Sequence, residues 1–279
     1  MLNNLSGLDH VVVLVRDLAA AADHWRKLGF TISPRGTHSP HLGTGNHTIM
    51  LGPDYIELLG VLAETPHNAP SREFLASGGE GIERVAFRAG DAQGAIEELR
   101  QRGIAAEGPL DFGRPIDRPD GSKSEARFRT LFWPMQERPG GLRIFACQHL
   151  TPENVWLPEL QTHANTAQRI LDVSVLTARP QDAAGQLARL IGSEASAERD
   201  GVWRVPTGHG KADVLFVARN MLAARYPALD LGSISEERAV VLRLAVKDRH
   251  AAARCAGVTA GQGRAIAVAA SGLVLEFAA

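Results

Sequence analysis

Two side chains differ in chemistry from the apolar segments that contain them. Glu57 lies inside the run YIELLG, and His10 lies inside LDHVVVLV. A carboxylate in an apolar strand is costly to bury unless it is paired, bound to a ligand or solvated in a cavity. A lone histidine in such a strand either forms hydrogen bonds in the core or faces a functional site, where imidazole serves as acid, base or metal ligand. Both residues are therefore candidate catalytic groups, with structural pairing as the alternative.

The segments that must position these residues form a weak internal repeat. Residues 8–15 predict a buried strand because they are rich in Val and Leu. A helix follows, which Asp17 would cap and Gly29 would end, and three short strand-like segments come next. The same order begins again near residues 82, 169 and 240. Short gaps between the strands favour antiparallel neighbours over a doubly wound parallel sheet, so the pattern predicts an α+β fold of four tandem βαβββ modules.

One segment interrupts the repeat. Residues 151–167 include Pro152 and Pro158, which block a long helix, and predict an ordered linker. The linker would join a first domain of two modules, residues 1–150, to a shorter and degenerate second domain, residues 168–279.

Composition excludes several classes of protein. The chain has 279 residues with 30 Lys plus Arg and 31 Asp plus Glu, which gives no support for a nucleic-acid or anionic-membrane partner. Its two cysteines are too few for a disulfide framework. It contains neither an apolar run long enough to span a bilayer nor the start of a signal peptide, so the expected location is the cytoplasm.

The repeat and two motifs resemble the vicinal oxygen chelate superfamily, which includes glyoxalase I and the extradiol dioxygenases. The motifs are GTGNHTIMLGPDYIELLGV and C-Q-H-x-T-P-E-x-x-W-x-P-E, and both are similar to glyoxalase-like domains. The resemblance implies paired modules whose mixed, mostly antiparallel sheets curl into a cup, with helices outside and often a divalent metal at the base. Its members include lyases, isomerases, dioxygenases and metal-free binding proteins, so the fold does not settle the reaction.

The resemblance also implies where metal ligands would stand, on the first and last strands of each module. In the first module these positions match His10 and Glu57. If both side chains line the cup, they can hold one divalent metal (Zn, Ni, Mn or Fe(II)) with water, or act as acid and base. In the second module Arg84 matches His10, and Phe145 matches Glu57 within one position. Neither of these two residues can ligate a cation.

The second domain is weaker still as a metal site. Its matching positions are Val173, Val241 and Glu276, which leave one carboxylate.

A histidine elsewhere in the first domain would have to complete a metal site. We expect His149 to join His10 and Glu57 as a ligand, with pinning of the linker as the structural alternative. For the substrate, Arg84 or Arg129 would hold a carboxylate, unless these arginines face solvent. The remaining substrate-binding candidates are Asn46, Phe145 and His41.

Two functions remain open at this point. The first is an enzyme, of the lyase, isomerase or dioxygenase type, that acts on a small, oxygen-rich and anionic metabolite with or without a divalent metal. The second is a metal-free small-molecule binding protein that keeps the fold without catalysis, which the departures at Arg84 and Phe145 favour. Because resembling proteins exchange modules between subunits, a homodimer is also expected.

Overall fold

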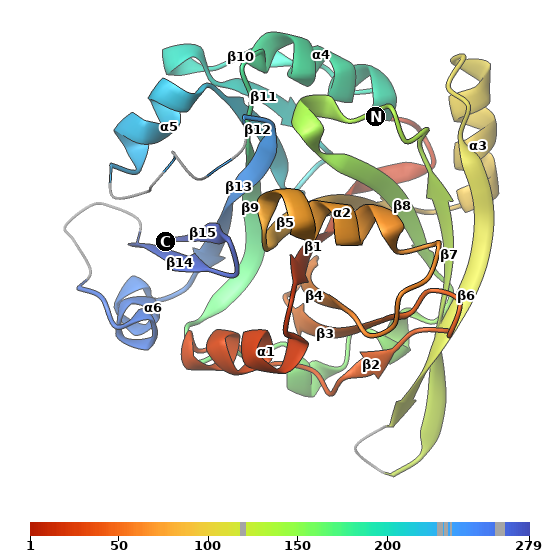
Figure 1. Cartoon of the computed structure of the whole chain (residues 1–279), viewed down its shortest axis with the longest axis horizontal. Coiled ribbons are helices and arrows are strands. Elements are labelled where there is room, and N and C mark those ends of the chain that lie inside the picture. Colours follow the sequence, from red (N-terminus) through yellow and green to blue (C-terminus); the bar gives the residue numbers. More distant parts are fainter. Residues whose placement is uncertain (118–120, 228–230, 232–233, 235, 260–265) are drawn as a thin grey trace.

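The structure is a computed structural model that describes residues 1–117, 121–227, 231, 234, 236–259 and 266–279 (Figure 1). Its strands form one curved, unclosed sheet in which most neighbouring strands are antiparallel. The predicted α+β fold of tandem βαβββ modules is confirmed. Among the described residues, no helix has the length and apolar character needed to cross a bilayer.

The first half of the chain contains two modules. The first consists of β1 (Leu5–Val15), α1 (Leu18–Lys27), β2 (Gly36–Thr37), β3 (Thr44–Met50) and β4 (Tyr55–Val61). The second consists of β5 (Gly81–Ala89), α3 (Ala92–Gln101), β6 (Glu107–Asp117), β7 (Lys123–Phe132) and β8 (Arg143–His149). Between them lies a helix that the sequence did not predict, α2 (Ala69–Gly78).

The second half repeats this order with shorter elements. Its first module consists of β9 (Ala167–Leu176), α4 (Pro180–Ile191), β10 (Ser196–Ala197), β11 (Trp203–Pro206) and β12 (Asp213–Val217), followed by α5 (Arg219–Arg225). The next consists of β13 (Arg238–Val246), α6 (Arg249–Ala256), β14 (Ile266–Ala270) and β15 (Leu273–Ala278). The linker contains two short 3-10 turns, Pro152–Asn154 and Pro158–Leu160.

Local sequence explains the helix ends of the first half. Asp17 accepts a hydrogen bond from the backbone of Ala20 at 2.9 Å, and so caps α1 as predicted. Gly29 follows α1 with a φ of +87°, and a Cβ there would lie 2.9 Å from the Asn165 backbone nitrogen. Only glycine suits that position, because it combines a left-handed conformation with a close approach of the linker.

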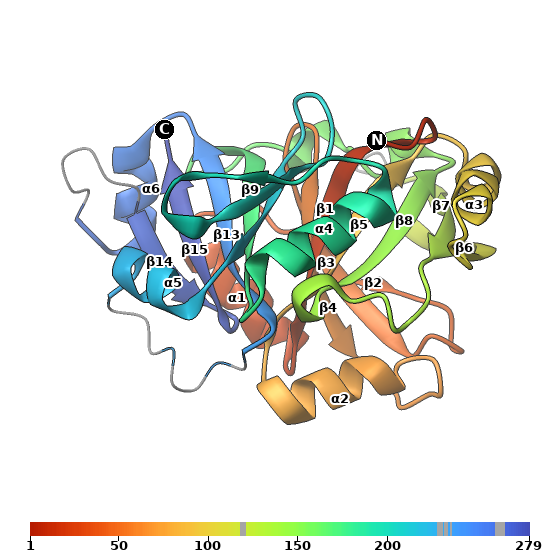
Figure 2. The same cartoon turned by 90° about the horizontal axis from the view of Figure 1, so that it is seen from above.

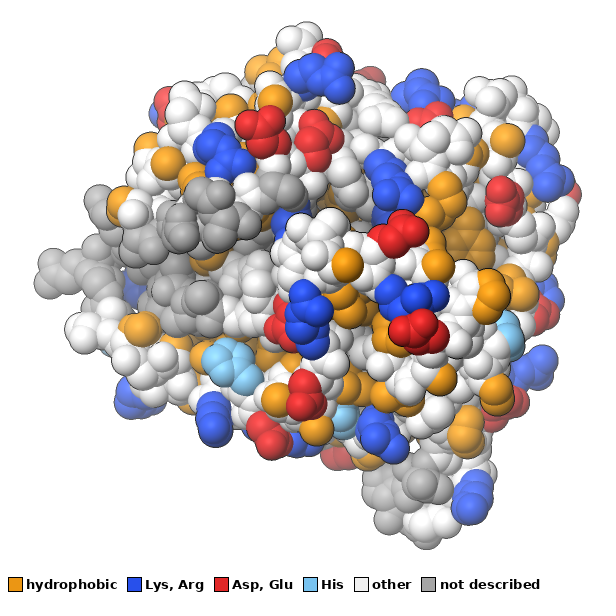
Figure 3. Space-filling model, in the orientation of Figure 1, with side chains coloured by type: hydrophobic (Ala, Val, Ile, Leu, Met, Phe, Trp, Pro, Cys, Tyr) orange, Lys and Arg blue, Asp and Glu red, His pale blue; other side chains and the backbone are white. Residues whose placement is uncertain are grey.

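The two halves lie side by side and share one hydrophobic core (Figure 2). They meet in the sheet where β5 and β13 pair at Ile82 and Ala239. The same core cluster contains Val11 from the first half and Val173 from the second. On the face in Figure 3, acidic and basic side chains are interspersed. Both halves thus contribute to the core and to the sheet that support the cup of the first half.

Candidate functional site

The floor of the first cup depends on an irregularity in β1. Residues next to each other in a regular strand point to opposite faces. The pairing of β1 with β5 shifts register between Leu8 and His10, however, as in a β-bulge. Leu8 and Val11 both enter the core, while the two residues between them, Asp9 and His10, contact each other. The bulge thus brings an acidic residue beside the histidine.

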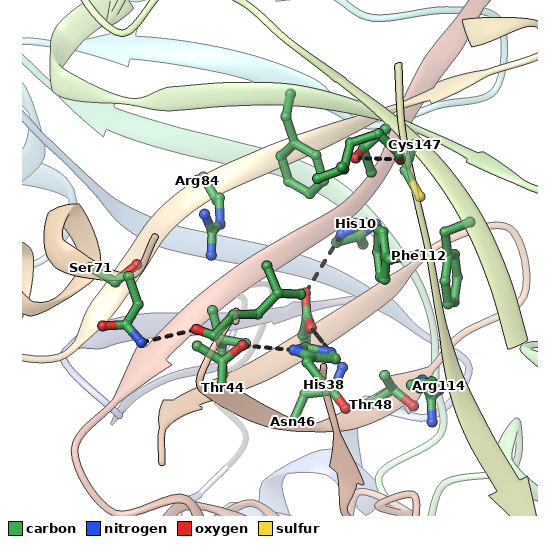
Figure 4. A pocket seen from close by; sticks show the side chains of 18 of the residues that line it. His10, His38, Thr44, Asn46, Thr48, Ser71, Arg84, Phe112, Arg114 and Cys147 are labelled. Carbon is green, nitrogen blue, oxygen red and sulfur yellow. Dashed lines mark hydrogen bonds and ion pairs between the residues drawn. The ribbon is translucent and has the colours of Figure 1, made fainter. Parts of the chain in front are cut away.

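The cup encloses a cavity with about 950 Å³ of empty space, part of it open to solvent (Figure 4). Both catalytic candidates, His10 and Glu57, line it. One group of lining residues is aromatic and comprises Tyr55, Phe112, Phe128, Phe132 and Phe145. Another group is polar and includes His38, Thr44, Asn46, Thr48, His67, Asn68, Ser71, Arg84 and Arg114. Such a cavity suits a small ligand with an apolar body and a charged or polar group.

Among the described residues that line this cavity, Glu57 alone carries a carboxylate. Its Oε1 accepts a hydrogen bond from Asn46 Nδ2 at 2.6 Å, and its Oε2 lies 3.7 Å from His10 Nε2. His38 Nε2 lies 4.0 Å from Oε1. Burial by itself would raise the pKa of Glu57, but His10, His38 and the Asn46 hydrogen bond together hold it below its ordinary value. The group is therefore a carboxylate at neutral pH.

Behind His10 lies a second carboxylate, that of Asp9, which is fully buried. Its Oδ2 accepts hydrogen bonds from His10 Nδ1 at 2.8 Å and from His149 Nε2 at 2.7 Å. Its Oδ1 accepts one from Arg88 Nε at 2.6 Å. Burial opposes ionisation, but His149 and His10 lower the pKa of Asp9 well below its usual range. Since ionised Asp9 occupies Nδ1 of His10, only Nε2 of that ring is left to face the cavity.

Aromatic contacts fix the plane of the His10 ring. Tyr55 stacks on it, with ring centroids 4.3 Å apart, and Phe145 meets it edge-on at 5.4 Å. Because the ring is packed on both sides, its Nε2 stays directed at Glu57.

Comparisons with known proteins identify the family. A family model described as "Glyoxalase-like domain" matches residues 8–191. The chain belongs to the glyoxalase-like domain family. No curated protein matches it. The fold is similar to that of a hypothetical protein from Staphylococcus aureus, with a TM-score of 0.71, 12% identity and coverage of 97% of this chain and 98% of that one.

Two further solved structures match this chain in whole or in part. One is a mutant of 4-hydroxymandelate synthase from Streptomyces coelicolor, with a TM-score of 0.57 and 14% identity over 91% of this chain and 75% of that one. The other is methylmalonyl-CoA epimerase from Mycobacterium tuberculosis, with a TM-score of 0.41 and 21% identity over 53% of this chain and 91% of that one. The predicted resemblance to glyoxalase-like domains is confirmed by the family model, and the structures with TM-scores of 0.71 and 0.57 have a similar fold.

Five of the site residues expected from the sequence come together in this glyoxalase-like cup. They are His10, Asn46, Glu57, Arg84 and Phe145.

The other three expected site residues lie outside the cavity. Arg129 pairs with Asp111 at 2.6 Å, because the alternation of β7 directs its neighbours Phe128 and Thr130 inward instead. His41 is exposed, and its neighbour Leu42 lines the cavity. His149 lies behind the floor on Asp9, because the bulge of β1 turns that carboxylate toward it.

Sequence reasoning missed several groups of the site. Asp9 was overlooked because a regular strand would place it opposite His10, and nothing in the sequence marks the bulge. His38 was not among the expected site residues, but its Nδ1 lies 2.8 Å from Thr44 Oγ1 and its ring lines the cavity. Arg114 enters from β6, a strand whose residues gave no chemical signal.

The donor set of this glyoxalase-like cup does not fit a chelated divalent metal. Among the described residues, no three His, Cys, Asp or Glu side chains are placed to share an ion. His10 and His38 each face a different oxygen of Glu57, at 3.7 and 4.0 Å, so that carboxylate is already shared between two imidazoles, while Arg84 adds a positive charge that would repel a cation. Phe145 provides no donor atom at all.

The corresponding face of the second half carries a group of ion pairs. Arg243 lies 3.1 Å from both Asp172 and Glu276, and Arg225 of α5 lies 2.9 Å from Glu276. Val173 does not reach this face as the sequence alignment expected, since it belongs to the main core.

Proposed function

We propose that the chain binds a small anionic metabolite in the first cup and moves a proton on it without a metal. The observation that carries this proposal is the row Asp9–His10–Glu57, with His10 between two carboxylates at 2.8 and 3.7 Å. Asp9 accepts the hydrogen on Nδ1 of His10, and Nε2 faces the Glu57 carboxylate across 3.7 Å. When Nε2 also carries hydrogen, the site would hold a proton donor, His10, next to a proton acceptor, Glu57.

The chemistry that suits this pair is proton transfer beside a carbonyl group. Glu57 would remove a proton from the bound ligand, and His10 Nε2 would return its proton at a neighbouring atom. Asp9 would fix the tautomer and the orientation of His10 throughout. The aromatic side chains would exclude water, which strengthens the electrostatic interactions within the cup.

Two measurements test the proposal. Protein purified without chelator should contain no stoichiometric metal, and Ni, Zn, Mn or Fe(II) should not raise its Tm. In D2O, the protein should exchange the α-proton of at least one member of a panel of small oxo- and hydroxy-carboxylates, followed by NMR. Glu57→Gln should abolish exchange, because an amide cannot accept the proton. The matched control is Glu125→Gln, an exposed glutamate outside the cavity, which should leave exchange unchanged.

A second candidate function is binding without catalysis. The replacement of two ligand positions by Arg84 and Phe145 favours it, because these residues provide charge and apolar surface but no acid or base at neutral pH. Tight binding of a small carboxylate without α-proton exchange, in wild type and Glu57→Gln alike, would establish this function instead. Stoichiometric metal in the purified protein would contradict both candidates.

A further inference from the structure

The two modules of the first cup carry the same local arrangement at their first strands. In β1 the order is Leu8, Asp9, His10, Val11, and in β5 it is Ile82, Glu83, Arg84, Val85. The first and last residues of each set lie in the main core. The β1–β5 pairing shifts register between Leu8 and His10 in β1, and between Ile82 and Arg84 in β5. Each acidic residue also contacts the residue that follows it. Arg84 is thus the counterpart of His10 in the second module.

Strand pairing extends this correspondence to the neighbouring strands. Val12 pairs with Glu57 on one side and with Arg84 on the other. In the same way, Ala86 pairs with Phe145 on one side and with His10 on the other. Phe145 therefore corresponds to Glu57. The first module contributes the pair His10 and Glu57, and the second module contributes Arg84 and Phe145 at the matching positions.

Arg84 shares one buried carboxylate, that of Glu83, with a second arginine. The carboxylate of Glu83 is fully buried and contacts two guanidinium groups, Arg84 Nε at 3.0 Å and Arg143 Nη1. Arg143 points away from the cup into a separate hollow beside α2, while Arg84 lines the cup (Figure 4). One negative charge thus serves two positive ones. By contrast, Asp9 has a single arginine partner, Arg88.

The terminal nitrogens of Arg84 remain available for a ligand. Glu83 engages only Nε, and no hydrogen bond joins Nη1 or Nη2 to another described residue. The Phe145 ring lies 5.8 Å from the guanidinium carbon and stacks against Phe132 at 6.1 Å. The apolar part of a ligand whose carboxylate binds Arg84 would therefore contact the aromatic rings of Phe145 and Phe132.

Resting on the proposed function, we propose that Arg84 replaces the second-module metal ligand as the anchor of the ligand's anionic group. Its two terminal nitrogens bind one carboxylate in the paired geometry that guanidinium favours. Among the described residues that line the cup, two guanidinium groups, Arg84 and Arg114, face one carboxylate, Glu57, so the ligand class is a monocarboxylate with an aromatic or branched apolar body.

Three small probes test the charge and its anchor by calorimetry and thermal shift. They are phenylacetate, its neutral analogue phenylacetamide and the dianion homophthalate. Wild type should bind phenylacetate at millimolar concentration, and at least tenfold more tightly than either other probe. Arg84→Met should weaken phenylacetate binding about tenfold to a hundredfold, the range of a lost charge-assisted pair. Arg127→Met, a change at an exposed arginine outside the cavity, should leave the affinity unchanged.

The outcomes separate this inference from the proposed function. Arg84-dependent binding of phenylacetate without any proton exchange supports the anchor and contradicts the acid–base role. Absence of phenylacetate binding by wild type, equal affinity for phenylacetamide, or undiminished affinity in Arg84→Met overturns the anchor.

A second variant tests the positional correspondence independently. Arg84→His combined with Phe145→Glu restores donor types at both positions, so the folded double variant should take up one Zn or Ni per chain. A folded double variant that binds no metal would overturn the correspondence. If the double variant does not fold, the Arg84→Met measurement decides.

Discussion

At the residue scale, the site depends most on Asp9, which holds three side chains with one carboxylate. Asp9→Asn would leave the Arg88 guanidinium without its only carboxylate and remove an acceptor that His10 and His149 share. Breaking a buried pair in this way costs about 3 kcal/mol. We expect a loss of this size in the free energy of unfolding, measured by urea denaturation at neutral pH.

The control for this prediction is Asp111→Asn, because Asp111 pairs with Arg129 outside the cavity. Its exposed ion pair should contribute little to stability.

The dependence of stability on pH gives an independent check on Asp9. His149 and His10 hold the pKa of Asp9 well below the ordinary range of an aspartate, so its stabilising contribution should be present above that range and be lost only as the pH falls toward the lower folded pKa. If Asp9→Asn were as stable as Asp111→Asn, the contacts of Asp9 with His10, His149 and Arg88 would not stabilise the fold.

The same residues show what the sequence alone can predict. His10 and Glu57 stand out because a polar side chain inside an apolar strand is costly to bury unless it has a partner. Strand alternation also places each of them on a definite face. Arg84 and Phe145 follow from the repeat. Asp9 cannot be found this way, because a bulge arises from the pairing of two strands distant in sequence. Arg129 was misplaced for a related reason, since alternation gives two faces but does not say which one meets a cavity.

At the element scale, α2 is the helix that lies over the cup, and a residue of the second half holds its end. Arg238 donates to the carbonyls of Gly78 and Glu80, and its guanidinium carbon lies 4.6 Å from the Phe74 ring. The Gly78 carbonyl belongs to the last turn of α2, where helices leave oxygens without partners, and Glu80 lies two residues beyond the end of the helix. Sequence missed α2 because its flanks are rich in Pro, Gly and Asn, which predict turns.

We therefore expect Arg238→Met to loosen α2 specifically. The change removes the hydrogen bonds to the helix end but keeps the apolar contact with Phe74, so the free energy of unfolding should fall by about 1–3 kcal/mol. Amide hydrogen exchange should accelerate in residues 69–78 but not in α3, which Arg238 does not contact. Since Asn68 and Ser71 line the cavity, phenylacetate should also bind more weakly. Unchanged exchange in α2 would contradict this role.

At the scale of the whole molecule, the two halves are joined by polar contacts as well as by the shared core. Thr207 Oγ1 accepts a hydrogen bond from the Leu8 backbone at 2.9 Å, two residues before His10. Lys211 Nζ donates to the Pro53 carbonyl at 3.0 Å. The repeat in the sequence predicts the two halves, but which surfaces of them meet depends on side-chain packing that periodicity does not encode. The second half thus supports the bulged strand that carries the site.

This junction contains a buried acid whose charge should make stability depend on pH. Asp54 is fully buried, and its Oδ1 accepts a hydrogen bond from the Ile170 backbone at 3.0 Å. Its Oδ2 has no hydrogen-bond partner in the described part of the chain. Burial raises the pKa of Asp54 to about 7, although Ile170, Lys211 and Arg169 act in the opposite direction. The folded protein therefore binds this proton more tightly than the unfolded chain does.

The sign of the effect follows from that difference. A carboxyl group with a raised folded pKa stabilises the protein fully below its unfolded pKa, near 4, and the contribution is lost as pH rises to about 7. Asp54→Asn keeps the acceptor for Ile170 but carries no charge, so it should be more stable than wild type above neutral pH by about 1–4 kcal/mol. Below pH 4 the two proteins should differ little. Urea denaturation at several pH values measures this, and parallel pH profiles for the two proteins would mean that Asp54 keeps its ordinary pKa at the junction.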